Sequence, residues 1–402
     1  MLRRLPLPIA LAALLLCSST LAAQKTPKRP RLADGDTNSA RAYVEEGFRI
    51  LEKDPRGAAD AYYWAIRIDP SMADAFYGRR TAMMMAEPRR LLAYDRGSRG
   101  VMQSEEMQRL DSLLSQAFLL NPMLPMRLER MLTLATIKAY VEEGGGPPLT
   151  LSDQMELQMW FDRYVRSAYN GAALRARMEQ SSGNNTRALQ FYADAIKSNK
   201  KNAELRAARG RLFLQIGEAD SALNEIKLAL EELRKRDKKD FVVFYNSKAM
   251  LELTTGIAHE TRGEKALAKE AYGRALQEDL AYYPAHVRLG FLALGDKDTT
   301  TALSEMELAV QLRPDDAVLR DRYGYSLLVV GKTDSALVQL NKAVELEPYY
   351  ALPRRHLGEA YEMAQKAPEA KAAYKAFLAT ASRTDPMRNA VEKQLAGLGA
   401  IP

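Results

Sequence analysis

Residues of the kinds that perform catalysis are few in this sequence and stand far apart. The 402 residues include three histidines, His259, His286 and His356, and one cysteine, Cys17. His259 is followed by Glu260, but no second histidine stands one helical turn later, so the spacing of a zinc-protease helix is missing. The histidines therefore predict no metal site.

Other motifs with a chemical mechanism are also missing from the sequence. It contains no Gly-rich phosphate loop, no nucleophile elbow and no dinucleotide-binding fingerprint. The carboxylates are numerous, but none belongs to a recognisable catalytic pair, and we interpret them as solvated helix faces. From these patterns we predict that the protein is not an enzyme and uses no cofactor.

The balance of charge gives little indication of a polyanionic partner. The formal net charge of +7 is spread along a long chain. The densest charged run, from Arg234 to Asp240, mixes basic and acidic residues, which favours a solvated linker over a nucleic-acid patch. We therefore predict no nucleic-acid partner.

The first 23 residues have the pattern of an export signal. Arg3 and Arg4 precede an apolar stretch from Leu5 to Leu16, and small residues follow as far as Ala23. The apolar stretch is too short to span a bilayer, and no later stretch is long and apolar enough. We predict an exported, periplasmic chain whose mature form has no transmembrane segment.

A lipid anchor at Cys17 is the alternative interpretation of the same segment. The preceding residues Leu14 to Leu16 disfavour it, since bacterial lipoprotein signals usually carry a small residue just before the cysteine. Cleavage after Ala23 would remove the chain's one cysteine, so the mature protein would form no disulfide.

Small residues recur every 34 residues in the second half of the chain. Two helices can approach closely only where side chains are nearly absent, so this period is typical of stacked helical hairpins. The glycines of this series are Gly256, Gly290, Gly324 and Gly358, and the alanines twelve residues after each are Ala268, Ala302, Ala336 and Ala370.

These phases resemble the tetratricopeptide repeat (TPR). That family prefers a small residue at position 8, alanine at 20, an aromatic at 24, alanine at 27 and proline at 32 of a 34-residue unit. The frame 317–350 fits best, with Gly324, Ala336, Ala343 and Pro348 in place and Leu340 instead of the aromatic. The frame 203–236 contributes Gly210 and Ala222 at the first two of these positions.

The resemblance implies an all-α fold, a right-handed superhelical α-solenoid of TPR helix-turn-helix hairpins. Family members mostly serve as scaffolds that bind peptides and proteins. We expect the chain to comprise a signal peptide (1–23), a flexible basic, Pro-rich tether (24–38), two irregular TPR-like hairpins (39–122), a helical connector with a Gly/Pro hinge at 144–148 (123–168), a six-repeat array (169–384) and a capping helix with a tail (385–402). The second hairpin is stretched by an insertion at 83–104.

In such repeats, positions 2, 5, 9, 12 and 13 of the first helix line the inner groove. The Lys and Asn pattern with which some members grip a terminal carboxylate is missing here, so chaperone tails are not the expected ligand. The resemblance implies a largely apolar groove with charged flanks. The predicted groove residues are Arg211, Met250, Leu253, Ile257, Val287, Phe291, Tyr325, Leu328, Arg355 and Glu359.

Two interpretations of this groove remain open. It holds a segment of a partner, or the superhelix and the amino-terminal hairpins fold over it and make it interior packing. The repeat positions also predict that His259 and His286 pack in the interior and that His356 is exposed.

The sequence favours an exported scaffold that docks a protein or peptide segment in the groove. One alternative is an envelope enzyme or glycan-processing component with its site in residues 72–168. Another is a structural protein that assembles with itself.

Overall fold

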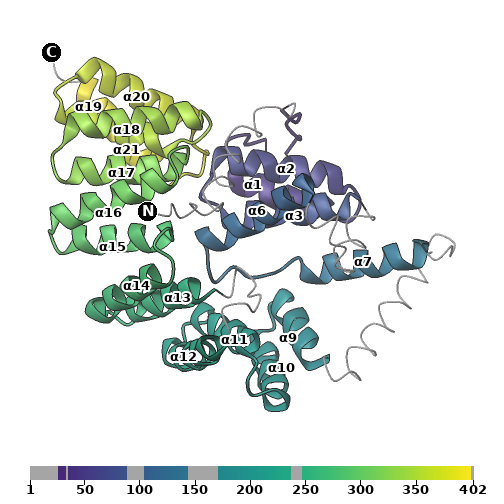
Figure 1. The fold of residues 1–402 in the computed structure, drawn as a ribbon. Coiled ribbons are helices and arrows are strands. Elements are labelled where there is room, and N and C mark those ends of the chain that lie inside the picture. The colour runs from purple at the N-terminus through teal and green to yellow at the C-terminus, as the bar shows by residue number, and fades with distance from the viewer. Residues whose placement is uncertain (1–25, 33–34, 88–103, 144–170, 237–246, 400–402) are drawn as a thin grey trace, which may run out of the picture.

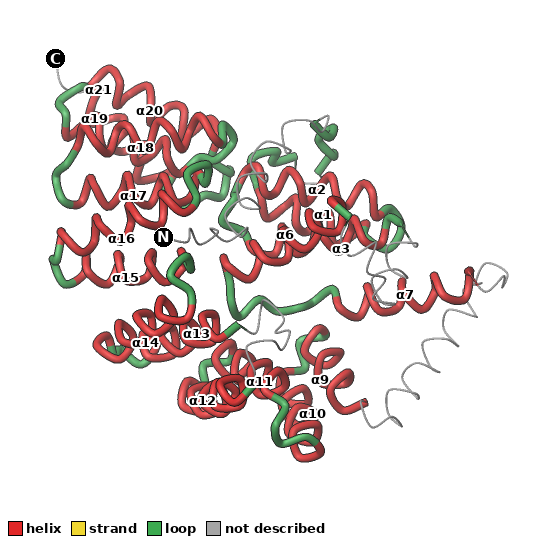
Figure 2. Tube along the Cα trace, in the orientation of Figure 1, coloured by secondary structure: helices red, strands yellow, loops and turns green. Residues whose placement is uncertain are grey.

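The computed structural model describes residues 26–32, 35–87, 104–143, 171–236 and 247–399, and every regular element in these ranges is an α-helix (Figure 2). The predicted signal peptide, Cys17, the hinge at 144–148 and most of the 83–104 insertion lie outside the described residues.

The second half of the chain is an array of helical hairpins. The pairs are α9 (Gly171–Ser181) with α10 (Asn185–Ser198), α11 (Ala203–Gln215) with α12 (Ala219–Lys235), α13 (Lys248–Thr261) with α14 (Lys265–Glu278), α15 (Tyr283–Gly295) with α16 (Thr299–Leu312), α17 (Ala317–Val329) with α18 (Thr333–Leu346), and α19 (Leu352–Met363) with α20 (Ala367–Thr380). The predicted all-α solenoid of helical repeats is confirmed.

The amino-terminal part also folds as hairpins. Helix α1 (Ala40–Ile50) pairs with α2 (Pro55–Ile68), and α3 (Ala73–Met85) pairs with α6 (Glu105–Leu120). Helix α7 (Glu129–Glu143) follows, and α21 (Arg388–Gly399) packs on α20 at the other end of the chain. The array runs as a curve from α9 to α20, and α1, α2, α3 and α6 stand on its inner side (Figure 1).

Each array hairpin from α11 to α20 is held together where a glycine on its first helix meets a large side chain on its second. A Cβ added to Gly256 would overlap the ring of Tyr272, and one added to Gly358 would overlap Tyr374. Both tyrosine rings are fully buried. The same contact occurs in the other three hairpins, between Gly210 and Ile226, Gly290 and Met306, and Gly324 and Leu340.

The alanines of the repeat have the matching role on the second helices. Ala222, Ala268, Ala302, Ala336 and Ala370 are all fully buried. In two of the hairpins the backbone carbonyl of this alanine, Ala222 or Ala302, would lie 3.3 Å from a Cβ on the partner glycine. The helices therefore approach until the backbone of one meets the backbone of the other.

The structure corrects the expectation for one histidine. His356 is buried rather than exposed, and its Nδ1 lies 2.7 Å from a carboxylate oxygen of Asp321 on the first helix of the preceding repeat. A buried carboxylate needs a partner, and the histidine supplies it across the repeat junction. His286 is buried as predicted, whereas His259 is half-buried and lies 2.7 Å from Glu264.

His286 is placed to carry a positive charge. Its Nδ1 lies 2.6 Å from Glu305 Oε2, and its Nε2 lies 3.0 Å from the carbonyl oxygen of Leu280. Burial alone would lower its pKa, but the hydrogen bonds to Glu305 and to Leu280 outweigh that effect and raise the pKa above 6.5.

We predict opposite effects for two glycine-to-alanine changes in one hairpin. Gly256→Ala should destabilise the protein by about 1–3 kcal/mol, because the new methyl group must displace the buried Tyr272 ring. Gly273→Ala on α14 meets no neighbouring atom within 4 Å and should stabilise the helix by about 0.5–1 kcal/mol. Urea unfolding followed by circular dichroism measures both, and equal midpoints would contradict this account of the hairpin.

The His286 pair predicts a stability that depends on pH. Because the pKa of the folded histidine is raised, its contribution is complete below the unfolded value near 6.5 and is lost as pH rises through the folded pKa. The free energy of unfolding should therefore decline above about pH 6.5, and less so in His286→Gln. His259→Gln leaves the pair in place and should keep the decline; a decline unchanged in His286→Gln would refute the assignment.

Candidate partner-binding surface

The first helices of the repeats lie on the inside of the curve. Helix α11 contacts α13 directly, and α17 contacts α19, although each pair is separated in sequence by a second helix. In the described array no two second helices of neighbouring repeats contact each other as extensively, so the first helices lie closer together than the second helices do, which makes their side concave.

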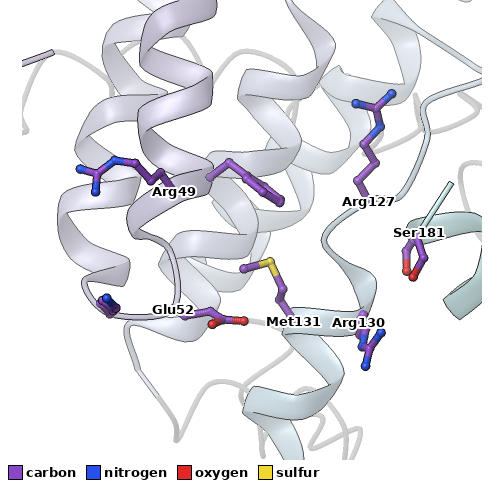
Figure 3. Close-up of a pocket in the computed structure, with 9 residues that line it drawn as sticks. Arg49, Glu52, Arg127, Arg130, Met131 and Ser181 are labelled. Atoms are coloured by element: carbon purple, nitrogen blue, oxygen red, sulfur yellow. The ribbon is translucent and has the colours of Figure 1, made fainter. Parts of the chain in front are cut away.

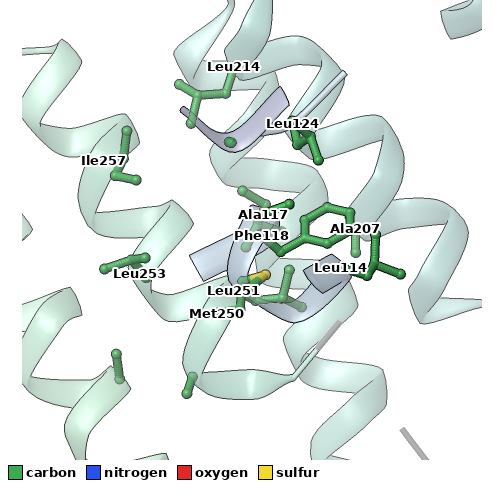
Figure 4. Packing of buried hydrophobic residues seen from close by; sticks show 14 of the residues in the cluster. Leu114, Ala117, Phe118, Leu124, Ala207, Leu214, Met250, Leu251, Leu253 and Ile257 are labelled. Carbon is green, nitrogen blue, oxygen red and sulfur yellow. The ribbon is translucent and has the colours of Figure 1, made fainter. Parts of the chain in front are cut away.

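Helix α6 covers the beginning of this inner face. Leu114, Ala117 and Phe118 of α6 belong to the same buried cluster as groove residues of α11 and α13. Phe118 lies close to Ala207 and Leu251 (Figure 4). Further along α6, Leu119 packs against the cluster that contains Val287 of α15.

The predicted groove residues of this part are therefore buried. They are Met250, Leu253, Ile257 and Val287. Leu328 is buried as well, in a cluster with Leu357 of the next repeat. From α11 to the start of α15, the amino-terminal hairpins fold over the groove, which is the second of the two arrangements that the sequence left open.

Farther along the array, apolar side chains of the inner face are exposed. We call Phe291, Tyr325, Val329 and Met363 the inner stripe; they are 37%, 37%, 54% and 52% exposed. They come from α15, α17 and α19, the first helices of three consecutive repeats. Val329 and Met363 were not among the predicted groove residues, although both occupy position 13 of their frames, which was a usable signal.

The polar groups around the inner stripe are paired within the chain. Arg355 forms an ion pair with Glu359, with its Nε 3.4 Å from Glu359 Oε1, although this buried Nε makes no hydrogen bond. The Nη1 of Arg355 lies 2.9 Å from the sulfur of Met387. The ring of Tyr325 lies 5.0 Å from that of His356, which in turn bonds Asp321. The stripe therefore presents apolar area beside charges that already have partners.

Arg211 lies at the other end of the groove. Burial raises the pKa of Tyr192, and the positive charges of Arg177 and Arg211 oppose that rise. Glu129, the first residue of α7, also interacts with Arg177. Burial raises the pKa of Glu129, and the positive charges of Arg177 and Arg80 offset only part of that rise. At this end Arg177 thus interacts with Glu129 of α7, whereas Arg211 acts on Tyr192 of α10 within the array.

The amino-terminal hairpin also reaches the far end of the array. Arg67 of α2 lies 2.7 Å from Glu347, next to α18. Trp64 of α2 packs edge-on against Tyr349 with ring centres 5.2 Å apart, and the guanidinium of Arg29 lies 4.3 Å from the Trp64 ring. We call these contacts the clasp.

Residues of the segment predicted as a tether take part in a second contact of the same kind. Asp36 Oδ2 accepts hydrogen bonds from Ser382 Oγ at 2.8 Å and from the backbone N–H of Arg383 at 2.9 Å. Asn38 Nδ2 donates to the carbonyl of Ala379 at 2.9 Å. Burial would raise the pKa of Asp36, but these hydrogen bonds outweigh it and lower the pKa. Residues 36–38 therefore lie against the last array hairpin.

A pocket of about 420 Å³ opens where α1, the start of α7 and the end of α9 converge (Figure 3). Its lining residues are Phe48, Arg49, Glu52, Lys53, Arg127, Arg130, Met131, Ser181 and Ser182. Four of these carry a positive charge and one a negative charge, and Arg49 is paired with Glu46. The lining has a positive potential but offers no pair of carboxylates for acid–base chemistry.

Neither a metal-binding cluster nor a membrane-spanning helix occurs in the described ranges. Within them, no three or more His, Cys, Asp and Glu side chains are grouped so that they could hold a metal ion. No described helix is both long and apolar enough to cross a membrane.

Comparison with solved structures finds repeat proteins of the TPR type. YrrB, described as a TPR protein with an unusual peptide-binding site, shares 22% identity over 51% of this chain and 98% of its own, with a TM-score of 0.40. A TPR protein from Parabacteroides merdae shares 15% identity over 66% of this chain and 98% of its own, with a TM-score of 0.43. MamA from Desulfovibrio magneticus shares 21% identity over 44% of this chain and 94% of its own, with a TM-score of 0.38.

No protein-family model matches the chain, and no curated protein matches it.

The clasp predicts that one ion pair contributes far more to stability than another in the same hairpin. Arg67→Met leaves the largely buried Glu347 without its cation and should cost about 1–3 kcal/mol. Arg41→Met removes an exposed pair with Glu45 on α1 and should leave the urea midpoint unchanged within error. Similar midpoints for the two variants would mean that the clasp is only a surface contact.

Proposed function

We propose that this protein is an exported, non-catalytic scaffold that docks a segment of a partner protein on its inner stripe. Export rests on the pattern of residues 1–23, which lie outside the described residues. The docking surface rests on the arrangement of α15, α17 and α19.

The observation that carries the proposal is a contrast within one groove. In the repeats from α11 to α15, apolar side chains of the inner face are buried beneath α6. Beyond α6, the inner face again presents apolar side chains, and there Phe291, Tyr325, Val329 and Met363 are exposed. Exposed apolar residues on neighbouring helices of a concave surface are typical of a site for a partner.

The chemistry of the surface favours binding over catalysis. Arg355 and Glu359 form an ion pair with each other, and the Asp321–His356 pair is buried, so neither pair stands open to a substrate. Two aromatic rings among aliphatic side chains are instead the composition of interface hot spots.

The test uses a double variant of the inner stripe. Phe291→Ala with Tyr325→Ala should weaken binding of a captured partner about 10-fold or more, because truncated hot-spot residues cost about 2 kcal/mol or more. Partners are first captured by crosslinking in the cell envelope, then purified and titrated directly. The circular-dichroism spectrum should not change, since both side chains are partly exposed.

A control removes two apolar side chains outside the inner stripe that are even more exposed than Phe291 and Tyr325. Leu280→Ala with Val338→Ala truncates residues that are 76% and 65% exposed and should leave the affinity unchanged. Equal affinities for the two double variants would refute the docking surface, as would unfolding of the stripe variant. Light scattering at several concentrations shows whether the captured partner is a second copy of the chain.

A further inference from the structure

Helix α6 shows what kind of segment the groove accommodates. Its buried residues are Met107, Leu110, Leu114, Ala117 and Phe118, a spacing of three and four residues that forms one apolar face of a helix. The carboxyl-terminal part of that face meets the first helices of the array, because Leu114, Ala117 and Phe118 share a buried cluster with residues of α11 and α13. Its beginning packs elsewhere, since Met107 and Leu110 form a separate cluster with Met84 of α3. The covered groove is therefore filled by the carboxyl-terminal part of an amphipathic helix.

The direction of α6 leads toward the inner stripe. Leu114, Ala117 and Phe118 contact the repeats of α11 and α13, and Leu119 near its carboxyl end contacts the cluster of α15. Helix α6 ends at Leu120. Four residues later, Leu124 packs in the cluster that contains residues of α11 and α13. The described chain thus leaves the groove where the inner stripe begins.

The groove keeps its geometry past that point. The hairpins of α15, α17 and α19 are closed by the same contact, between a glycine and a large side chain, that closes those of α11 and α13. Adjacent first helices pack at about 8–10 Å, so three of them span about 20 Å. At 1.5 Å per residue, a helix of about 12–13 residues covers that distance. This is slightly shorter than α6.

The surroundings favour contact through apolar side chains. Arg355 and Glu359 pair with each other, and Tyr374 donates a hydrogen bond to Glu362. A partner therefore gains little from net charge and most from filling the stripe with apolar side chains.

We infer that the inner stripe receives a short amphipathic helix of a partner protein, lying end to end with α6 in the same groove. This inference rests on the proposed function and adds the conformation and apolar pattern of the partner. The apolar residues of that helix follow the spacing of α6, three and four residues apart over about three and a half turns.

The probe is a fluorescein-labelled peptide that copies residues 104–121, the sequence SEEMQRLDSLLSQAFLLN. Its anisotropy is followed during titration with the full chain. A second peptide carries Ser112→Pro, which breaks the helix at an exposed position and keeps every buried residue of α6. The parent peptide should bind saturably and gain helical circular dichroism, and the proline peptide should bind at least 10-fold more weakly.

Protein variants locate the binding. Phe291→Ala with Tyr325→Ala should weaken the parent peptide at least 10-fold, and Leu280→Ala with Val338→Ala should not. Binding that is unaffected by the stripe variant would mean that the peptide displaces the chain's own α6, and the inference would fall.

Two further outcomes separate the inference from the proposed function. Equal binding of the proline and parent peptides, with loss in the stripe variant, would refute the helical partner and leave the docking surface intact. Failure of the parent peptide to bind at all would refute the helical partner, whereas the proposed function would still be decided by the captured partner.

Discussion

The structure depends on the distance at which the two helices of each array hairpin pack. A glycine on the first helix lets a large side chain from the second, such as Tyr272, lie against the backbone. Repeating one contact at one spacing gives every hairpin nearly the same shape, and equal shapes stack into a regular curve. The concave face, the groove and the exposure of Phe291 and Tyr325 all follow from that regularity.

The amino-terminal hairpins complete the array rather than merely precede it. Through Phe118 and its neighbours, α6 buries apolar area of α11 and α13 that would otherwise face water. The clasp joins α2 to the far end through Arg67 and Glu347. Interior packing and candidate docking surface are therefore two stretches of one groove, which differ in whether the chain itself covers them.

Local spacing in the sequence was sufficient to predict the hairpins, because Gly256 and Tyr272 lie sixteen residues apart within one unit. The covering of Met250 and Leu253 could not be predicted, since it depends on how distant units meet in space. Repeat position alone also failed for His356, whose burial comes from Asp321 thirty-five residues earlier. Contacts within a repeat leave a periodic signal in the sequence, whereas contacts between distant units do not.

The clasp has a mechanical consequence. An open superhelix of repeats behaves like a spring, because small changes at each junction add up along its length. The contact between Trp64 and Tyr349 joins the amino-terminal hairpin to the segment after α18 and so limits changes in the length of the superhelix. The distance between Phe291 and Met363 then fluctuates less, so binding a partner segment would cost less conformational entropy of the groove.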